Sequence, residues 1–166
     1  MARNVAFLSE LLILTLIFYQ DLKYRAVNWL LFLGLAILGF TMSLLAIGFK
    51  NTLLNAMFNN VVVLLELSLV YLYFLIKMRR GIKFINEKLG IGDVMMLFAL
   101  SFSFSPVNFM VFVLLSLIIS LSIALIWKEG PTIPLAGYMG LCYLIFLTLN
   151  HFVLNYDVYM GSIRIQ

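Results

Sequence analysis

The sequence predicts an all-α polytopic membrane protein, a bundle of about six transmembrane helices in a single domain over residues 1–166. Of its 166 residues, 64% are hydrophobic and only 11% are charged, whereas soluble domains are roughly half apolar and about a quarter charged. The apolar residues form runs of roughly the length at which a helix crosses a bilayer, about 20 residues. Only helices satisfy the backbone polar groups of such runs in lipid, and the runs are too uniformly apolar for barrel strands.

Three apolar segments fill the first half of the chain: residues 5–20, 27–49 and 52–76. The first carries Glu10 within its apolar run and no small-x-small cleavage site follows it, so we expect it to stay in the mature chain rather than to act as a signal peptide. The second ends at the polar pair Lys50-Asn51. The third ends in a basic run, Lys77-Met78-Arg79-Arg80.

Three further apolar segments fill the second half: residues 90–104, 107–127 and 134–153. The first of these is short for a membrane span. Ser105-Pro106 ends it, because proline lacks a backbone donor and restricts the residue before it. The second is closed by residues 128–131, Lys-Glu-Gly-Pro, and a short polar tail follows the third. Six spans use nearly all of the 166 residues and leave no room for a separate soluble domain.

The positions of the basic residues predict the orientation of the bundle. The loops after the first, third and fifth segments carry eight of them, and the opposite side carries three: Lys23, Arg25, Lys77, Arg79, Arg80, Lys83, Lys88 and Lys128 against Arg3, Lys50 and Arg164. Cytoplasmic loops of membrane proteins are rich in Lys and Arg, so we expect the first group in the cytoplasm and both termini outside. The cluster at residues 77–88 is then a topology signal or, alternatively, a docking surface for anionic lipid headgroups. The net charge of +4 therefore indicates orientation rather than nucleic-acid binding.

Two acidic residues are predicted at the same membrane boundary. Asp21 closes the first segment and Asp93 opens the fourth, both at the cytoplasmic end. Two carboxylates a few ångströms apart cannot both ionise, so one holds a proton that the other lacks. Such a pair is suited to activating water against a peptide carbonyl, with one carboxylate as base and the other as acid.

Two other acidic residues, Glu10 and Glu66, are predicted near the middle of their segments. Glu66 shares a helical face with Asn55 and Asn59. One interpretation is a protonated, hydrogen-bonded polar seam between helices. The other is an ion or proton path across the bundle.

Residues 90–93, Gly-Ile-Gly-Asp, place two glycines before Asp93 at a helix start. Gly90 and Gly92 would leave the backbone exposed beside the carboxylate, so an extended substrate could approach closely. A helix N-terminus also favours the ionised form of a carboxylate. Glycines before a helix can alternatively mean only a flexible turn.

Three motifs resemble those of a known family. Residues 90–93 resemble the GxGD signature of membrane aspartyl proteases, and residues 21–28 resemble the segment around the other aspartate of the type IV prepilin peptidase family. Residues 133–137, Ile-Pro-Leu-Ala-Gly, look like the family's Ile-Pro-Phe-Gly/Ala segment, which opens the last span. The chain is thereby identified as similar to the prepilin and preflagellin peptidases, in a short form without the cysteine-containing cytoplasmic domain of the long bacterial enzymes.

The resemblance implies an aspartic endopeptidase with Asp21 and Asp93 as the catalytic pair. It implies cleavage of the basic leader of prepilin-like membrane proteins at the cytoplasmic face of the plasma membrane, in type IV pilus assembly or protein secretion. Arg25 and Asn28 would either support the carboxylates or simply anchor the chain at the interface. We expect no cofactor and no metal, since the chain has one His and one Cys, Cys142.

The chain also departs from the family pattern. Met95 stands where many bacterial members have Lys, and Val27 rather than Pro precedes Asn28. Gln20 precedes Asp21, which argues against the presenilin-like proteases, because their first aspartate follows Tyr. The alternative function is a non-enzymatic membrane protein, either a transporter-like bundle using Glu10 and Glu66 or an inactive family member.

Overall fold

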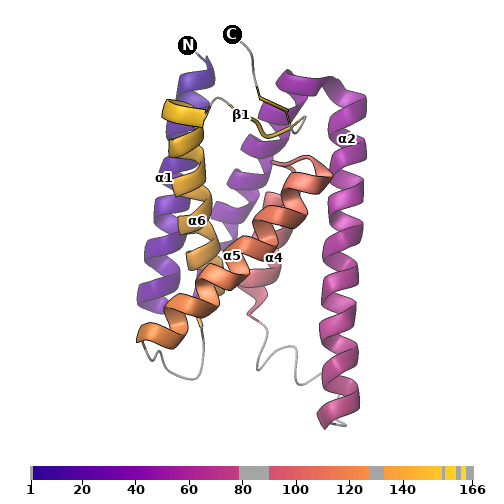
Figure 1. Cartoon of the computed structure of the whole chain (residues 1–166). Helices are drawn as coiled ribbons and strands as arrows, with labels where there is room; N and C mark the ends of the chain where they lie inside the picture. The colour runs from indigo at the N-terminus through magenta and orange to yellow at the C-terminus, as the bar shows by residue number, and fades with distance from the viewer. Residues whose placement is uncertain (1, 79–89, 128–132, 155, 160–161, 164–166) are drawn as a thin grey trace.

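A computed structural model describes residues 2–78, 90–127, 133–154, 156–159 and 162–163, and it is almost entirely helical (Figure 1). Every predicted apolar segment is helical over most of its length. The elements in chain order are helix α1 (Ala2–Tyr24), α2 (Trp29–Met78), α4 (Ile91–Leu100), α5 (Pro106–Trp127) and α6 (Leu135–Leu149), the π-helix η1 (Asn150–Leu154), and strands β1 (Tyr156–Asp157) and β2 (Ser162–Ile163).

The expectation of about six transmembrane helices is wrong in its count, because the described residues form five α-helices. The second and third predicted segments belong to one element, the 50-residue α2. At about 1.5 Å per residue such a helix would be roughly 75 Å long if straight, more than twice the apolar thickness of a bilayer. It bends at Gly48, whose φ of 78° is open to glycine at little cost, and the two halves run in opposite directions (Figure 1).

Helix α4 is too short to cross a membrane alone. It has 10 residues, so it extends only about 15 Å. A turn at Ser101–Ser105 ends it, and α5 begins at Pro106, with the Phe109 N–H donating to the Ser105 carbonyl (2.8 Å). Four helices of the described part, α1, α2, α5 and α6 with its continuation into η1, are long and apolar enough to span a bilayer.

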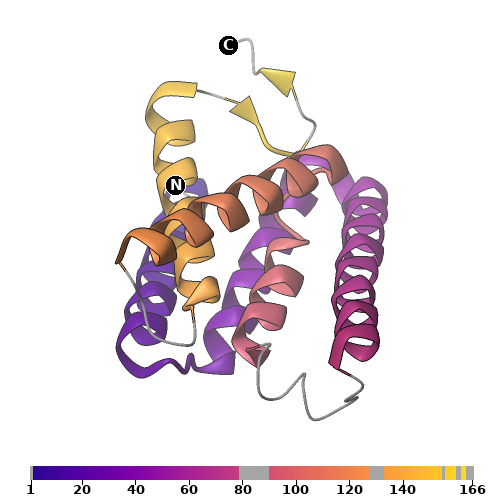
Figure 2. The same ribbon diagram turned by 60° about the horizontal axis from the view of Figure 1, so that its bottom comes forward.

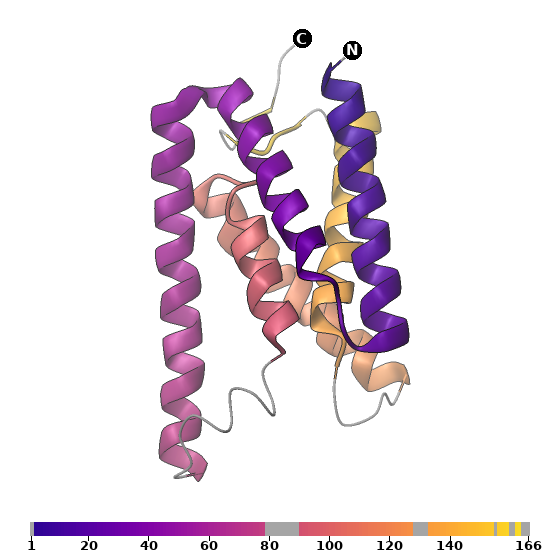
Figure 3. The ribbon, with the colours of Figure 1, turned by 180° about the vertical axis from the view of Figure 1, so that it is seen from behind.

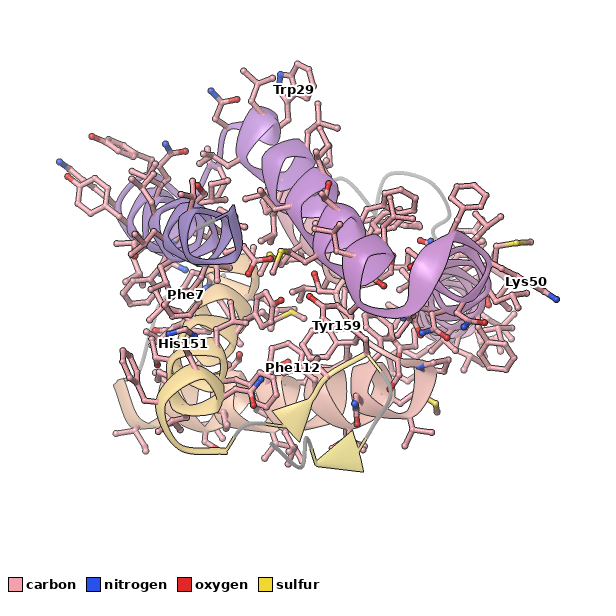
Figure 4. All side chains as sticks on the ribbon, turned by 90° about the horizontal axis from the view of Figure 1, so that it is seen from above. Phe7, Trp29, Lys50, Phe112, His151 and Tyr159 are labelled. Atoms are coloured by element: carbon pink, nitrogen blue, oxygen red, sulfur yellow. The ribbon has the colours of Figure 1, made fainter. Side chains whose placement is uncertain are left out.

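The core forms where α1 packs along α6 and α4 packs along α2. Leu14 and Ile17 of α1 and Met96 of α4 are fully buried and belong to this core. Helix α5 runs obliquely across one side of the bundle and packs on α6 and α2 (Figure 2). Figure 4 shows Trp29 and Lys50 pointing away from the bundle, whereas Phe112 lies within it.

The tail after α6 folds back over the bundle, which the sequence did not indicate. Strands β1 and β2 pair antiparallel, with Tyr156 opposite Ile163. Between them, the Val158 carbonyl accepts hydrogen bonds from the Ser105 N–H (3.1 Å) and from Asn108 Nδ2 (2.8 Å). The tail therefore satisfies polar groups at the turn between α4 and α5.

The basic residues at positions 79–88, Lys128 and Arg164 lie outside the described residues. Within the described part, the connection from α1 to α2, the last residue of α2 and the first residues of α4 and α6 all lie toward one end of the bundle, whereas the Gly48 bend and the β strands lie toward the other (Figure 1). The first end is the one that carries Lys23 and Arg25.

Asn59 ties the second half of α2 to the end of α4. Its side chain is fully buried, and Nδ2 donates to the carbonyls of Ser101 (2.8 Å) and Phe104 (2.9 Å). Asn55 donates weakly to the Tyr159 carbonyl (3.5 Å), and Glu66 makes no hydrogen bond with any described residue. The predicted seam therefore joins the asparagines to backbone carbonyls rather than to Glu66.

Replacing Asn59 with Leu is expected to destabilise the protein. The carbonyls of Ser101 and Phe104 would lose their donor, and each unsatisfied buried polar group costs about 1–3 kcal/mol. Thermal unfolding of the detergent-solubilised protein should show a clear fall in Tm. Asn55→Leu, one turn earlier on the same face, should change Tm much less; equal effects of the two variants would contradict this account.

Candidate active site

Asp21 lies in the last turn of α1, with only 8% of its surface exposed. The helix stops just after it because Arg25 adopts a left-handed conformation (φ 53°), while the Arg25 N–H donates to the Asp21 carbonyl (3.0 Å). Arg25 itself is exposed. The helix end thus holds Asp21 at the border between α1 and the loop.

Asn28 caps the start of α2. Its side-chain Oδ1 accepts from the Leu30 N–H (3.1 Å), and its own N–H donates to Oε1 of Gln20 (2.9 Å). Gln20 is the residue before Asp21, so Asn28 joins the two helix ends on either side of this loop. Its contacts are with the backbone of α2 and with Gln20, which makes it a support for the loop.

Asp93 lies in the first turn of α4 and is half-buried. Gly90 is the N-cap residue, and its carbonyl accepts from the N–H groups of Asp93 (3.0 Å) and Val94 (3.3 Å). A Cβ atom on Gly90 would stand 2.9 Å from Asp93 Oδ2. The close approach at Gly90 is therefore to the carboxylate itself, whereas Gly92 faces Phe32 at an ordinary distance of 3.7 Å.

The two carboxylates meet at the start of α6. The Ala136 N–H donates to Asp93 Oδ1 (2.8 Å), and the next N–H in the chain, that of Gly137, donates to Asp21 Oδ2 (2.6 Å). Because these two amides are consecutive, the two oxygens lie within roughly 9 Å of each other. Three elements far apart in the sequence thus converge at one point.

The N-terminus of α6 suits two acidic partners. The first N–H groups of a helix have no partner within the helix, and the helix dipole places partial positive charge there. From Tyr138 onward the N–H groups bond back to the helix, the Tyr138 N–H donating to the Pro134 carbonyl (3.1 Å). The amides of Ala136 and Gly137 are therefore free to bind carboxylates, as anion sites at helix N-termini do.

Gly137 allows Asp21 to approach the helix backbone. A Cβ atom at this position would stand 3.0 Å from Asp21 Cβ and 3.1 Å from Asp21 Oδ2. Both distances are tighter than most real Cβ contacts, so a larger residue would displace the carboxylate. At Gly140, one turn later, a Cβ atom would stand 3.6 Å from its nearest neighbour, a methyl carbon of Ile17.

The arrangement is chemically that of a carboxylate pair. The charge of Asp21 acts on the Asp93 carboxyl, so the two groups are electrostatically coupled. A nearby like charge disfavours ionisation of both groups, so such a pair can provide one base and one acid at the same place. In the described part of the chain, no three His, Cys, Asp or Glu residues gather in a way that could hold a metal ion.

Of the two predicted mid-membrane acids, Glu10 lies apart from this pair. Glu10 is on α1, eleven residues or about 16 Å before Asp21, and only 4% of its surface is exposed. Its Oε1 atom has no hydrogen-bond partner among the described residues. Glu66 is half-buried on α2. Glu10 is therefore separated from the boundary pair along α1.

Sequence reasoning missed the role of the amides of Ala136 and Gly137. It singled out residues 133–137 only as a motif that opens the last span. A signal was present, since Pro134 marks the start of a helix, where free N–H groups are found. What the pattern lacked was any indication of which side chains those groups would meet.

Comparison with known proteins gives one family. The model of the type IV leader peptidase family matches residues 8–125, which include Asp21 and Asp93 but not the start of α6. No curated protein matches the chain, and no solved structure matches it either.

Proposed function

The chain belongs to the type IV leader peptidase family, and from this membership we propose that it is an intramembrane aspartic endopeptidase with Asp21 and Asp93 as its catalytic pair. Family membership indicates a peptidase that acts in a membrane on membrane-protein substrates. The observation that carries the proposed aspartic mechanism is the meeting of both carboxylates on consecutive amides of α6.

In the proposed mechanism a water molecule lies between the two carboxylates. One carboxylate takes a proton from the water while the water oxygen attacks the scissile carbonyl. The other carboxyl group, which is protonated, supplies a proton to the leaving amine. The Ala136 and Gly137 amides hold one oxygen of each carboxylate, so the positions of the acid and the base are set before substrate binds. Gly90 lies beside Asp93 and is exposed, so we assign it to the side from which substrate approaches.

The proposed substrate is a prepilin-like membrane protein with a short basic leader, cleaved at the cytoplasmic face. Two features support this choice: the family is one of leader peptidases, and Asp21 and Asp93 lie toward the end of the bundle that carries Lys23 and Arg25. Because Lys and Arg concentrate on cytoplasmic loops, that end is assigned to the cytoplasm and the termini to the outside.

The orientation can be measured with reporter fusions. A reporter fused after Lys83 is expected to be cytoplasmic, and one fused after Gln166 is expected to be external, because eight of eleven basic residues lie in the loops assigned to the cytoplasm. Accessibility of single cysteines introduced at the same positions provides an independent measurement. Finding both sites on the same side would overturn the assignment.

The proposed activity is tested with purified protein in vesicles and a prepilin-like protein with a basic leader. Mass spectrometry of the products is expected to show a single cut that separates the leader from the mature chain. A transporter-like bundle would instead depend on its mid-membrane acids. Glu10→Gln should therefore leave cleavage intact under the proposal, whereas loss of all function in this variant would favour transport.

A further inference from the structure

The second half of α2, residues 49–78, has one face that packs on the bundle near Asn59 and becomes more exposed further along the helix. Asn59 and Val63 on this face are fully buried. Glu66, the next residue of this face toward the C-terminal end of α2, is half-buried. Val70 and Tyr73 continue the same face at helical spacing and are 39% and 52% exposed. The face that packs on the bundle near Asn59 is therefore open from Glu66 onward.

Glu66 carries a carboxyl group without a partner on this open face. It makes no hydrogen bond or ion pair with any described residue. Its neighbours Leu64, Leu65 and Leu67 are apolar, within a helix long and apolar enough to span a bilayer. An acidic side chain in such a helix is costly unless it faces a polar partner, and it is by default a functional candidate.

Glu66 lies at about the same depth as Asp93. Asn59 and Asn60 both bond to Ser101, which fixes α2 against α4, and the two helices run in opposite directions (Figure 3). Glu66 follows Asn59 by seven residues, or about 10 Å along the axis. Asp93 precedes Ser101 by eight residues, or about 12 Å in the same direction. The lone carboxyl and the proposed catalytic pair thus stand at one level.

The lateral separation suits a bound peptide. Packed helix axes are about 8–10 Å apart, so the distance from Asp93 across α4 to Glu66 is on the order of one helix spacing. An extended chain covers roughly 3.3 Å per residue. A substrate held at Asp93 would therefore bring a residue about three positions from its scissile bond to Glu66.

Charge complementarity identifies the kind of residue that Glu66 would bind. The chain has seven acidic residues, and Glu87 and Glu129 lie outside the described part. Of the others, Asp21 and Asp93 form the proposed catalytic pair, Glu10 is buried about 16 Å from Asp21, and Asp157 lies in β1 at the far end of the bundle. Glu66 is thus the one described carboxylate at the level of the pair that remains to attract a cationic leader.

We propose that Glu66 is a specificity-determining residue, whose carboxylate binds a Lys or Arg side chain of the substrate about three residues from the scissile bond. The substrate segment would lie along the exposed face of α2 at Glu66 and Val70. This inference rests on the proposed peptidase function and names the feature of the substrate that the site selects.

The test measures kcat and KM for leader cleavage in vesicles with two substrates, one with its basic leader and one with each leader Lys and Arg replaced by Gln. Glu66→Gln removes the charge and keeps the shape. It is expected to raise KM for the basic substrate by about tenfold or more, the usual effect of losing a charged hydrogen bond, while kcat changes little. For the neutral substrate Glu66→Gln should have no effect on KM. Glu10→Gln, the matched loss of a buried carboxyl elsewhere, should leave both KM values unchanged.

A charge exchange makes the test independent of folding defects. Glu66→Lys should cleave the basic substrate poorly and should recover activity on a substrate whose leader cations are replaced by Glu. If wild-type protein cleaves the substrate but Glu66→Gln affects the basic and neutral substrates equally, or neither, the inference is wrong and the peptidase function stands. A fall in Tm or a change in oligomeric state without dependence on leader charge would instead place the partner of Glu66 in its own chain or in a second copy, and would also overturn the inference. Failure of the wild-type protein to cleave either substrate would refute the proposed function itself.

Discussion

Asp21→Asn and Asp93→Asn are each expected to abolish leader cleavage while the protein remains in the membrane at near-normal levels. Asparagine keeps the shape of the side chain, and its oxygen can still accept the N–H of Gly137 or Ala136. It cannot take or give a proton in the way a carboxyl does, and such proton transfer typically contributes about 10²–10⁴ to the rate. Each single variant should lose nearly all activity, because the acid and the base act as a pair.

The measurement is cleavage of a prepilin-like substrate in vesicles, with protein level and Tm determined in parallel. Asp157→Asn, the same substitution in strand β1 at the other end of the bundle, provides the control and should cleave normally. Normal cleavage by either Asp21→Asn or Asp93→Asn would end the aspartic-protease proposal. Loss of activity together with loss of protein would point instead to a folding role for the carboxylate.

Gly137→Ala is expected to reduce cleavage by several-fold with little change in the fold. The added methyl would stand 3.0 Å from Asp21 Cβ and 3.1 Å from its Oδ2, so Asp21 must move away from the α6 backbone. The 2.6 Å hydrogen bond between the Gly137 N–H and Asp21 would lengthen, and the carboxylate would leave its position opposite Asp93. A displacement of a catalytic group by about 1 Å can cost on the order of 10²-fold in rate, so a shift of a few tenths of an ångström is expected to lower the rate by several-fold.

Gly140→Ala is the matched control for this prediction. It places the same methyl one turn later on α6, where the nearest atoms are 3.6–3.8 Å away in ordinary contact. Alanine also favours the helix relative to glycine in both variants, so a difference in activity between them reports the contact with Asp21. Equal activity of the two variants would show that the amide of Gly137 does not position the carboxylate.

Much of the fold follows from the sequence because membrane insertion depends on contiguous apolar length. Each predicted segment sums the hydrophobicity of about 15–25 neighbouring residues, and that sum does not depend on how the segments pack. The number of elements differs because the second and third segments form one element, α2, whose helical backbone is interrupted at Gly48 and not at Lys50-Asn51, where the apolar pattern breaks. Backbone conformation at one glycine is a local property that an apolar run does not report.

The depth and length of α4 were decided by tertiary contacts. Its 10 residues cannot cross a bilayer, yet the helix is buried because α2 covers it and Asn59 satisfies the carbonyls at its end. The folding of the tail onto Ser105 and Asn108 is likewise a contact between distant segments. No pattern within either segment specifies such a contact.

The sequence by itself determined a helical membrane protein, the order of its apolar segments and the two aspartates that begin or end a helix. Only the tertiary structure decided that Asp21 and Asp93 meet, and that two consecutive amides of α6 hold them. Gly137 is 116 residues from Asp21 in the chain, so their contact depends on how closely α1 and α6 pack. That packing distance depends on Ile17 of α1 lying against Gly140 of α6, which has no side chain. The two residues come together only in the folded bundle.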